Sequence, residues 1–368
     1  MINDKYNFAV TLLLHHPICS IIPPHILKAI LREGGEEEQK WALQTMLINE
    51  RIRGRREVVG SMSAMFQVAG DKERSVYDSH NGQSKPNSKL IRKEGGKPAK
   101  DISINEAYDY SGATYDFYKN VFDRNSIDNK GMPLDSYVHW RRNWRNAQWD
   151  GSSMLYGDGD GKIFTRFTIA IDVIGHELTH GVTQYEAELE YHDQPGALNE
   201  SVSDVMGSLV KQYKLKQKAN EADWLIGQGI FVDKKNSIRS MKSPGTANPW
   251  DDQPSHMKDY KKLPDDEDHD EGGVHINSGI PNHAFYLIAK QIGGEAWKKA
   301  GLTWYKTLSS GLSTGASFEE FASHTFVVAG NLFGSNSKEQ KAVYKGWDDV
   351  GVTINEKPLK VRSKKKRR

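Results

Sequence analysis

The segment His176–His180, with the sequence His-Glu-Leu-Thr-His, constrains the fold of this chain most strongly because it sets two histidines four residues apart. On a helix such residues share one face, so both imidazoles can bind one metal ion. Ile169, Val173 and Val182 give the same segment an apolar side. The pattern predicts a helix that faces a metal site, with Glu177 placed to polarise a metal-bound water. A surface helix with two unrelated histidines is the alternative.

A second helical segment offers the carboxylates that such a metal site would need. Glu200 and Asp204 are four residues apart, among apolar residues at helical intervals. A catalytic zinc takes three protein ligands, and a ligating histidine gives its other ring N–H to an oriented acceptor. One carboxylate can therefore bind the metal while the other receives that N–H. The alternative is an ordinary solvated acidic face.

A third histidine lies in a glycine-rich stretch, Gly272–Gly279. The flanking glycines predict an unusual backbone around His275, in a loop ahead of a helix whose first turn holds Pro281. Asp270, five residues before it, can orient the ring. The alternative is that His275 is a surface histidine without a functional role.

The cysteine count restricts the metal chemistry further. Cys19 is the only cysteine among 368 residues, so an intrachain disulfide framework and all-cysteine metal sites are excluded.

No apolar run is long enough to span a membrane. We expect no ordinary secretory signal, because Phe8–Leu14 is followed by no small-residue cleavage motif. Secretion without such a signal is favoured over retention in the cytoplasm.

Charge and periodicity divide the chain into parts. The first part, 1–57, has two short helical patterns, one from Pro23-Pro24 to Gly34-Gly35 and one over 36–52, before an arginine-rich hinge. Residues 58–167 are strand-like except for a helix over 105–122, and the chain beyond 169 is mostly helical. This order predicts an α+β fold with a β-rich half, a helical half and a cleft between them.

The last residues, 357–368, carry eight basic side chains and no acid. We expect 356–368 to be a solvated, disordered tail. Binding to nucleic acid, to an anionic membrane or to a receptor is the alternative, but no basic patch interleaved with aromatic residues supports nucleic acid elsewhere.

The motifs NAQWDG, HELTH, GALNESVSD and GGVHINSGIPN, in this order, resemble those of the thermolysin family of neutral zinc metallopeptidases. The resemblance runs from about Val58 to Val352. The N-terminal unit, with Ile22-Pro23-Pro24-His25, is similar to the short propeptide of the protealysin-like branch. The resemblance implies a two-domain fold, with domains over 58–190, including the zinc helix, and 191–355, preceded by a helical propeptide over 1–57.

The resemblance also implies a full set of catalytic groups, in which zinc and two side chains share the charge on the substrate oxygen. These are the zinc ligands His176, His180 and Glu200, the general base Glu177, the histidine partner Asp204, the oxyanion pair Tyr191 and His275, and Asp270, which supports His275. Substrate would be held by Asn146 and Ala147 of an edge strand, by Arg239, and by the apolar pocket residues Phe164, Phe167, Val173 and Ile238.

The implied function is that of a zinc-dependent endopeptidase made as a zymogen, which cleaves protein or peptide substrates on the amino side of bulky hydrophobic residues. Its propeptide would act as an intramolecular inhibitor, and we expect a monomer. The sequence does not indicate a proteinaceous inhibitor. The alternatives are a catalytically silent, zinc-stabilised binding protein and a nucleic-acid-associated protein that uses the basic tail.

The sequence departs from the family at its double calcium site. Asp172 and Asp223 match two of the acidic ligands, but Lys211 stands where another acid is expected, and Leu225 and Gln228 also replace acids. Calcium needs six to eight oxygen ligands. We therefore expect the double site to be absent or reduced to one weak ion.

Two other segments could be mistaken for calcium sites. Gly157–Gly161 alternates glycine and aspartate, but Lys162 and Ile169 stand where an EF-hand needs acids, so we expect a glycine-rich hairpin turn. The acidic run 265–271 is expected to be a solvated loop, with calcium binding as the alternative.

Cys19 is the remaining site candidate. A thiolate there could occupy the open zinc position and keep a precursor inactive, in which case Cys19→Ala would speed activation. A buried, inert thiol is the alternative. Cleavage between about 54 and 70 would release the propeptide.

Overall fold

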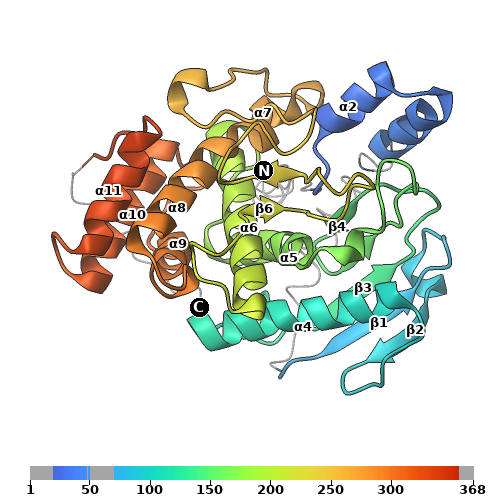
Figure 1. Cartoon of the computed structure of the whole chain (residues 1–368). Helices are drawn as coiled ribbons and strands as arrows, with labels where there is room; N and C mark the ends of the chain where they lie inside the picture. Colours follow the sequence, from blue (N-terminus) through green and yellow to red (C-terminus); the bar gives the residue numbers. More distant parts are fainter. Residues whose placement is uncertain (1–19, 48, 50–69, 356–368) are drawn as a thin grey trace, which may run out of the picture.

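The computed structural model describes residues 20–47, 49 and 70–355. Its β-rich half lies beside a half built almost wholly from helices, and two long helices run between them (Figure 1). The α+β fold predicted from the sequence is confirmed. Within the described part of the chain, no helix combines the length and the apolar character that crossing a bilayer requires.

A mixed five-stranded sheet forms the first half, in the order β2-β1-β3-β5-β4. β1 and β3 are parallel and β4 pairs antiparallel with β5 at the edge of the sheet. Helix α4 makes the crossover between β1 and β3, and its N-terminal N–H of Ser103 is capped by the Asp101 side chain. The bounds are β1 Arg74–Asp78, β2 Lys89–Lys93, α4 Ile102–Phe122, β3 Leu134–Val138, β4 Ala147–Trp149 and β5 Met154–Tyr156.

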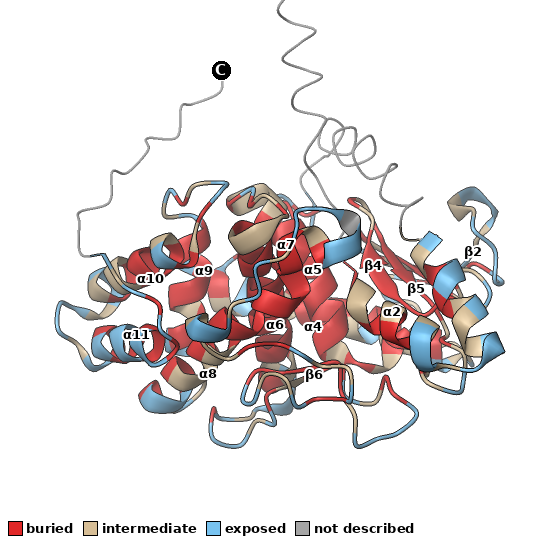
Figure 2. Cartoon of the chain, turned by 90° about the horizontal axis from the view of Figure 1, so that it is seen from above, coloured by how far each residue is buried: buried red, intermediate tan, exposed pale blue. Residues whose placement is uncertain are grey.

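Helices α5 (Ile171–Glu186) and α6 (Asp193–Leu215) are buried through the centre of the molecule (Figure 2). They approach closely because glycines face each other at their crossing. A Cβ on Gly175 would lie 3.1 Å from the Cα of Gly207, and a Cβ on Gly207 would lie 2.3 Å from the carbonyl oxygen of Asp172. Any side chain at Gly207 would therefore force the two helices apart.

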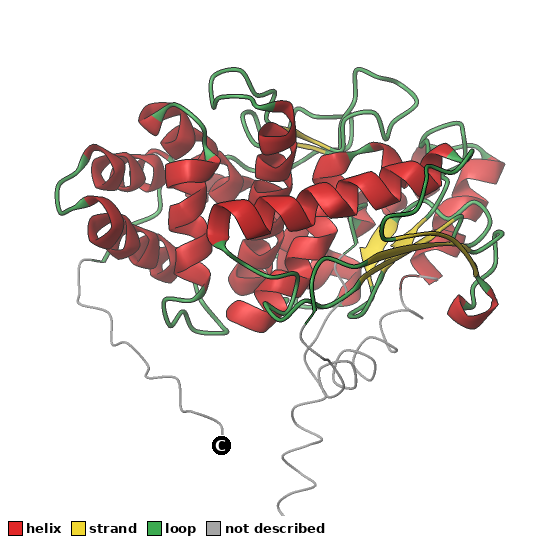
Figure 3. Cartoon of the chain, turned by 90° about the horizontal axis from the view of Figure 1, so that it is seen from below, coloured by secondary structure: helices red, strands yellow, loops and turns green. Residues whose placement is uncertain are grey.

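The second half is a set of helices (Figure 3). Buried aromatic rings lie between them. Trp304 and Trp347 are stacked with their ring centroids 5.7 Å apart, and both are fully buried. The bounds are α7 Asp270–Asn277, α8 Gly279–Ile292, α9 Leu302–Leu308, α10 Phe318–Phe333 and α11 Lys338–Asp349, with a π-helical turn at Trp297–Gly301 and a short pair of strands, β6 Leu225–Ile226 and β7 Arg239–Ser240.

The N-terminal unit packs on the rest of the described chain as a separate helical piece. Helix α2 (Pro24–Glu33) begins at the predicted prolines and ends at Gly34, and a second helix covers 36–47. Ile26, Leu27 and Ile30 are buried at the docking face, and Lys28 pairs with Asp268 across it at 3.1 Å. The boundary expected near residue 57 and the arginine-rich hinge lie outside the described residues.

Two local expectations are corrected. The stretch around His275 is not a plain loop: Glu271, Gly272 and Gly273 have left-handed backbone angles, and α7 then places His275 in a helical turn. Gly157–Gly161 is a glycine-rich turn but not a hairpin, because it connects β5 to Phe164, which bridges to Phe231. The Asp160 carboxylate holds this turn by accepting from three backbone N–H groups.

Candidate metal centre and active site

The three side chains expected to bind a metal converge in the buried interior between α5 and α6. The Nε2 atoms of His176 and His180 are 3.0 Å apart. Glu200 brings its carboxylate to 3.5 Å from His176 Nε2 and 3.4 Å from His180 Nε2. At most 1% of each side chain is exposed, so the ligand atoms face one another in a dry site.

The other ring nitrogen of each histidine is held by an acceptor, which leaves Nε2 for a metal. His176 Nδ1 lies 2.8 Å from Asp204 Oδ1, as expected from the sequence. His180 Nδ1 lies 2.8 Å from Asn199 Oδ1 and 3.1 Å from Ser203 Oγ. Asn199 and Ser203 were missed by sequence reasoning, although their four-residue spacing beside Glu200 and Asp204 is a signal for the same helix face.

The donor set fits zinc. Two imidazoles and one carboxylate are the ligands of a common class of catalytic zinc site. Glu200 Oε2 is buried and has no hydrogen-bond partner, which is costly in a protein interior unless a cation occupies the site. Within the described residues, the same three side chains form a group able to hold a metal ion.

Asp204 is the centre of a buried polar network. It accepts two hydrogen bonds from Arg239, both at 2.7 Å, and one from Asn282 at 2.8 Å. Burial alone would raise the pKa of Asp204, but the Arg239 charge and then the His176 hydrogen bond hold that pKa well below its usual value. Asp204 therefore stays ionised and fixes the tautomer of His176.

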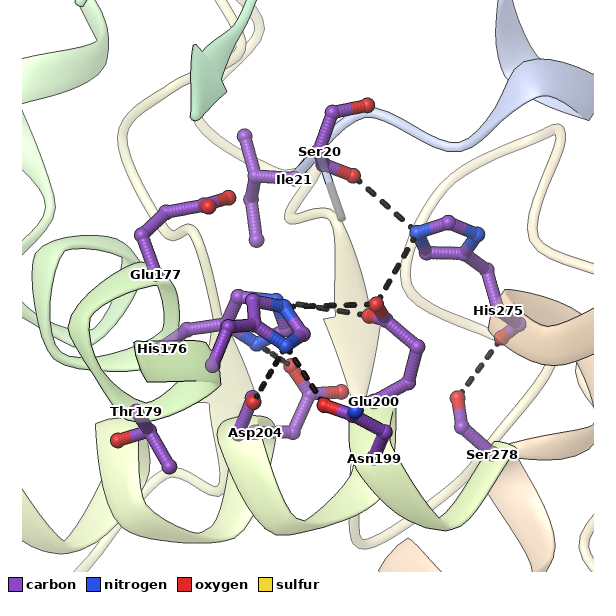
Figure 4. Close-up of polar contacts among 12 residues, drawn as sticks. Ser20, Ile21, His176, Glu177, Thr179, Asn199, Glu200, Asp204, His275 and Ser278 are labelled. Atoms are coloured by element: carbon purple, nitrogen blue, oxygen red, sulfur yellow. Dashed lines mark hydrogen bonds and ion pairs between the residues drawn. The ribbon is translucent and has the colours of Figure 1, made fainter. Parts of the chain in front are cut away.

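Glu177 lies on α5 beside the metal-binding face. Its Oε2 accepts a hydrogen bond of 2.9 Å from the backbone N–H of Trp149 in β4. The close-up shows its side chain directed toward Ile21, on the opposite side of the site from His275 (Figure 4). A buried carboxylate with a fixed direction is suited to moving a proton at this position.

Tyr191, His275 and Asp270 form a connected group on the other side. The hydroxyl of Tyr191 is 3.3 Å from His275 Nε2 and donates to Glu200. Asp270 accepts from both the ring and the backbone N–H of His275, at 2.6 and 2.8 Å. Burial lowers the pKa of His275, but the charges of Asp270 and Glu200 outweigh it and raise this pKa to about 9. His275 is therefore a hydrogen-bond donor at neutral pH.

The residues expected to hold substrate are in contact with the N-terminal segment. Ile21 N–H donates to Ala147 O at 3.3 Å, and Ile22 N–H donates to Asn146 Oδ1 at 3.1 Å. Arg239 Nη1 donates to the carbonyl of Ile21 at 3.2 Å. Phe164, Phe167, Val173 and Ile238 are all fully buried and belong to the same apolar cluster as Ile21 and Ile22.

Lys211 lies at the position of the family's double calcium site, which the sequence led us to expect to be absent or reduced to one weak ion. Its ammonium lies 3.2 Å from Asp172 and 2.8 Å from Asp223, and it also donates to the carbonyl of Leu225. Burial lowers the pKa of Lys211, but the two aspartate charges outweigh it and raise that pKa. Cys19, the other sequence candidate, lies outside the described residues.

Two family models match the chain. The thermolysin metallopeptidase catalytic domain matches residues 58–184, and the thermolysin metallopeptidase alpha-helical domain matches residues 187–352.

Similar proteins cover nearly the whole chain. An extracellular metalloprotease of Pectobacterium carotovorum subsp. carotovorum is 46% identical over 93% of this chain and 99% of its own length. Protease PrtS of Photorhabdus sp. (strain Az29) is 43% identical over 91% of this chain and 92% of its own. The solved precursor of protealysin, a metalloproteinase from Serratia proteamaculans, superposes with a TM-score of 0.81 at 46% identity, over 91% of this chain and 100% of that one.

Proposed function

Because the chain belongs to the thermolysin family of zinc metallopeptidases, and is a zinc metalloendopeptidase in precursor form, we propose the residues that carry its chemistry and its latency. The main observation behind this proposal is that His176, His180 and Glu200 converge on one buried point, with Glu177 beside it. These three side chains would hold zinc.

When bound there, zinc supplies a Lewis acid that polarises the substrate carbonyl and lowers the pKa of water. The N–H of Trp149 holds the Glu177 carboxylate in position. Glu177 accepts a proton from the attacking water and passes it to the leaving amine. Tyr191 and His275 donate hydrogen bonds to the oxygen that becomes negative. Asp270 keeps His275 oriented and protonated for this task.

We infer the substrate preference from the primed side of the site. Arg239 and Asn146 hold backbone groups, and the buried rings of Phe164 and Phe167 lie 5.9 Å apart in an apolar cluster. An apolar pocket of this kind favours a bulky hydrophobic residue after the scissile bond. Cleavage on the amino side of such residues is therefore proposed.

Latency is proposed to come from the N-terminal unit itself. Ser20–Ile22 makes backbone hydrogen bonds to the groups assigned to substrate, and these residues are buried. A chain that fills these positions excludes other substrates. The protein is thus proposed to be a precursor inhibited by its own propeptide. Secretion is proposed because a similar protein is named an extracellular metalloprotease.

The calcium proposal follows from Lys211. An ammonium ion already neutralises Asp172 and Asp223, so a divalent cation would meet repulsion there. We propose that this enzyme uses no calcium at that position.

The substitution Glu177→Gln tests the assigned role of the general base. Casein hydrolysis by the zinc-loaded enzyme should fall by roughly 10³-fold, because the amide cannot accept the proton. Glu319→Gln, at an exposed position on α10, is the matched control and should keep full activity. Zinc content and thermal unfolding should be unchanged in both variants.

A catalytically silent binding protein, the alternative considered from the sequence, would give no zinc-dependent hydrolysis in the parent protein. No finding favours that alternative. If Glu177→Gln kept the parent's rate while losing no zinc, the proposed role of Glu177 would be wrong.

A further inference from the structure

We propose that the peptide bond between Ser20 and Ile21 is a self-cleavage site, presented by the N-terminal unit to the catalytic groups of the same chain. This inference rests on the proposed function and adds to it a defined bond. It differs from the cleavage expected between about 54 and 70, which would release the whole unit.

The first argument is the direction of the chain through the site. His275 Nε2 contacts the carbonyl oxygen of Ser20 at 3.2 Å, and the next N–H, that of Ile21, donates to Ala147 O at 3.3 Å. The following carbonyl accepts from Arg239 and the following N–H donates to Asn146. Four consecutive backbone groups therefore contact residues that were assigned to the oxyanion or to the substrate backbone.

The second argument is that the contacts select one bond. The oxygen of a scissile carbonyl must lie at the groups that stabilise its negative charge. Among the described N-terminal residues, Ser20 supplies the carbonyl that contacts His275. The carbonyl of Ile21 is instead turned to Arg239, and that of Ile22 accepts from the Ser20 hydroxyl at 3.4 Å. The bond after Ser20 is therefore the one aligned for attack.

The third argument is the residue that follows the bond. Ile21 is a bulky hydrophobic residue, 0% exposed, and belongs to the main hydrophobic core, which also contains the pocket residues Phe167 and Val173. It matches the preference proposed for external substrates. Figure 4 shows the Glu177 carboxylate on the side of Ile21 opposite to Ser20 and His275, so the base and the oxyanion donor flank this dipeptide.

The reaction is a simple hydrolysis. The water oxygen bonds to the carbonyl carbon of Ser20, and the bond from that carbon to the nitrogen of Ile21 breaks. Glu177 takes a proton from the water and delivers it to the leaving nitrogen. The proton that remains on the new carboxyl group of Ser20 then passes to the amine of Ile21. The products are a carboxylate on Ser20 and an ammonium group on Ile21, and no other reactant is consumed.

Cleavage at this bond would not by itself open the site. Residues after Ile21 stay attached through α2, whose Ile26, Leu27 and Ile30 are buried, and through the pair of Lys28 and Asp268. The new amine is therefore held beside the carboxylate from which it left. The part of the unit that begins at Ile21 would therefore still fill the site after the cut.

The test follows the full-length, zinc-loaded chain by intact mass and N-terminal sequencing during incubation at neutral pH. We expect a species that begins at Ile21, formed at a rate independent of protein concentration, and absent from the Glu177→Gln chain. Ile21→Ala should slow this cut by roughly 10- to 200-fold, because the pocket loses methyl and methylene contacts. Leu43→Ala, exposed on the second helix of the same unit, should not slow it.

A second readout needs no catalysis. In the uncleavable Glu177→Gln chain, deuterium exchange at the amides of Ile21 and Ile22 should be slow, since both are hydrogen-bonded in the site. Fast exchange at both amides would overturn the proposal, because the bond would not be presented.

The remaining outcomes separate this inference from the function on which it rests. A preparation that hydrolyses casein while the Ser20–Ile21 bond stays intact overturns the self-cleavage site alone. A cut whose rate rises with protein concentration, or that persists in Glu177→Gln, does the same. A chain that does not cut itself, and that also fails to cut casein after its N-terminal unit has been removed, overturns the proposed function, and this inference with it.

Discussion

At the scale of one residue, Lys211 joins three elements through its ammonium group. Its ammonium pairs with Asp172, which is almost fully buried, and with the more exposed Asp223. It is also hydrogen-bonded to the backbone of Leu225, so it joins α6 to the start of α5 and to β6. A calcium ion at this place would make contacts of the same kind, but it would be lost on chelation.

We predict that calcium chelation by EGTA leaves the thermal unfolding midpoint of the Glu177→Gln protein unchanged. Lys211→Met in the same background should destabilise it by roughly 3 kcal/mol, because Asp172 is left buried without its partner. Denaturant unfolding monitored by tryptophan fluorescence measures this difference.

Lys211→Glu gives the opposite test of the same residue. The substitution adds a carboxylate to those of Asp172 and Asp223. The thermal stability of the variant protein should therefore become dependent on millimolar calcium. Two tight calcium sites in the parent protein, found by isothermal titration, would contradict the role assigned to Lys211.

The metal ligands were predictable at this scale because helical spacing fixes which side chains share a face. His176, His180, Glu200 and Asp204 are all brought together as expected. Asn199 was missed because its amide side chain is uncharged, and the metal site was sought among histidines and carboxylates. Ser20 and Ile21 were missed because their partners are more than a hundred residues away, and only the folded chain brings them together.

His139 connects two elements that the sequence pattern did not relate. Its Nε2 lies 2.9 Å from Asp101, which caps α4, and its Nδ1 lies 2.9 Å from Asp158 in the glycine-rich turn after β5. The hydrogen bond to Asp158 is the largest cause that raises the pKa of His139 to about 9, against the effect of burial. The protonated ring therefore ties the helix start to the turn.

We predict that this tie weakens in alkaline solution. The pKa of His139 is raised above its ordinary value of 6.5, so its contribution to stability is complete below about pH 6.5 and is lost as pH rises through about 9. In the Glu177→Gln background, the difference in unfolding midpoint between the parent and His139→Gln should shrink from about pH 7 to about pH 10. A constant difference would contradict this.

Element types were predicted better than their details. The chain beyond 169 is mostly helical, as expected, and α2 ends at the predicted glycine. α6 already starts at Asp193, ahead of Glu200, and Pro195 lies in its first turn, where a missing N–H costs nothing. The stretch around His275 was expected to be a loop because of its glycines. Four left-handed residues, 270–273, do precede the regular helical turn of α7.

At the scale of the whole molecule, docking of the N-terminal unit partly buries a titratable side chain. His25 lies near Asp270 and Asp252, with His275 and Arg239 also facing it, and its Nε2 is 3.8 Å from Asp252. Burial is the largest cause of its lowered pKa and outweighs the two carboxylates, which act in the opposite direction. His25 is therefore neutral when the unit is docked.

We predict that acid loosens this unit. The docked pKa of His25 is lowered below its ordinary value of 6.5, so docking is strongest above about pH 6.5 and weakens as pH falls below it. Deuterium exchange at the α2 amides of the Glu177→Gln chain, corrected for intrinsic rates, should accelerate from about pH 7.5 to about pH 5.5. His25→Gln should remove most of that acceleration. Equal acceleration in both chains would rule out His25 as the sensor.

The glycine contact between α5 and α6 has a consequence for metal choice. Zinc–nitrogen bonds are about 2.0 Å long, whereas calcium–oxygen bonds are about 2.3–2.6 Å. The ligands come from both helices, so the gap between these helices sets the size of the ion that all three can reach. With Gly175 and Gly207 at the crossing, the two backbones come closer than any side chain there would allow. Two residues that never touch the ion thus let ligands from both helices reach one point.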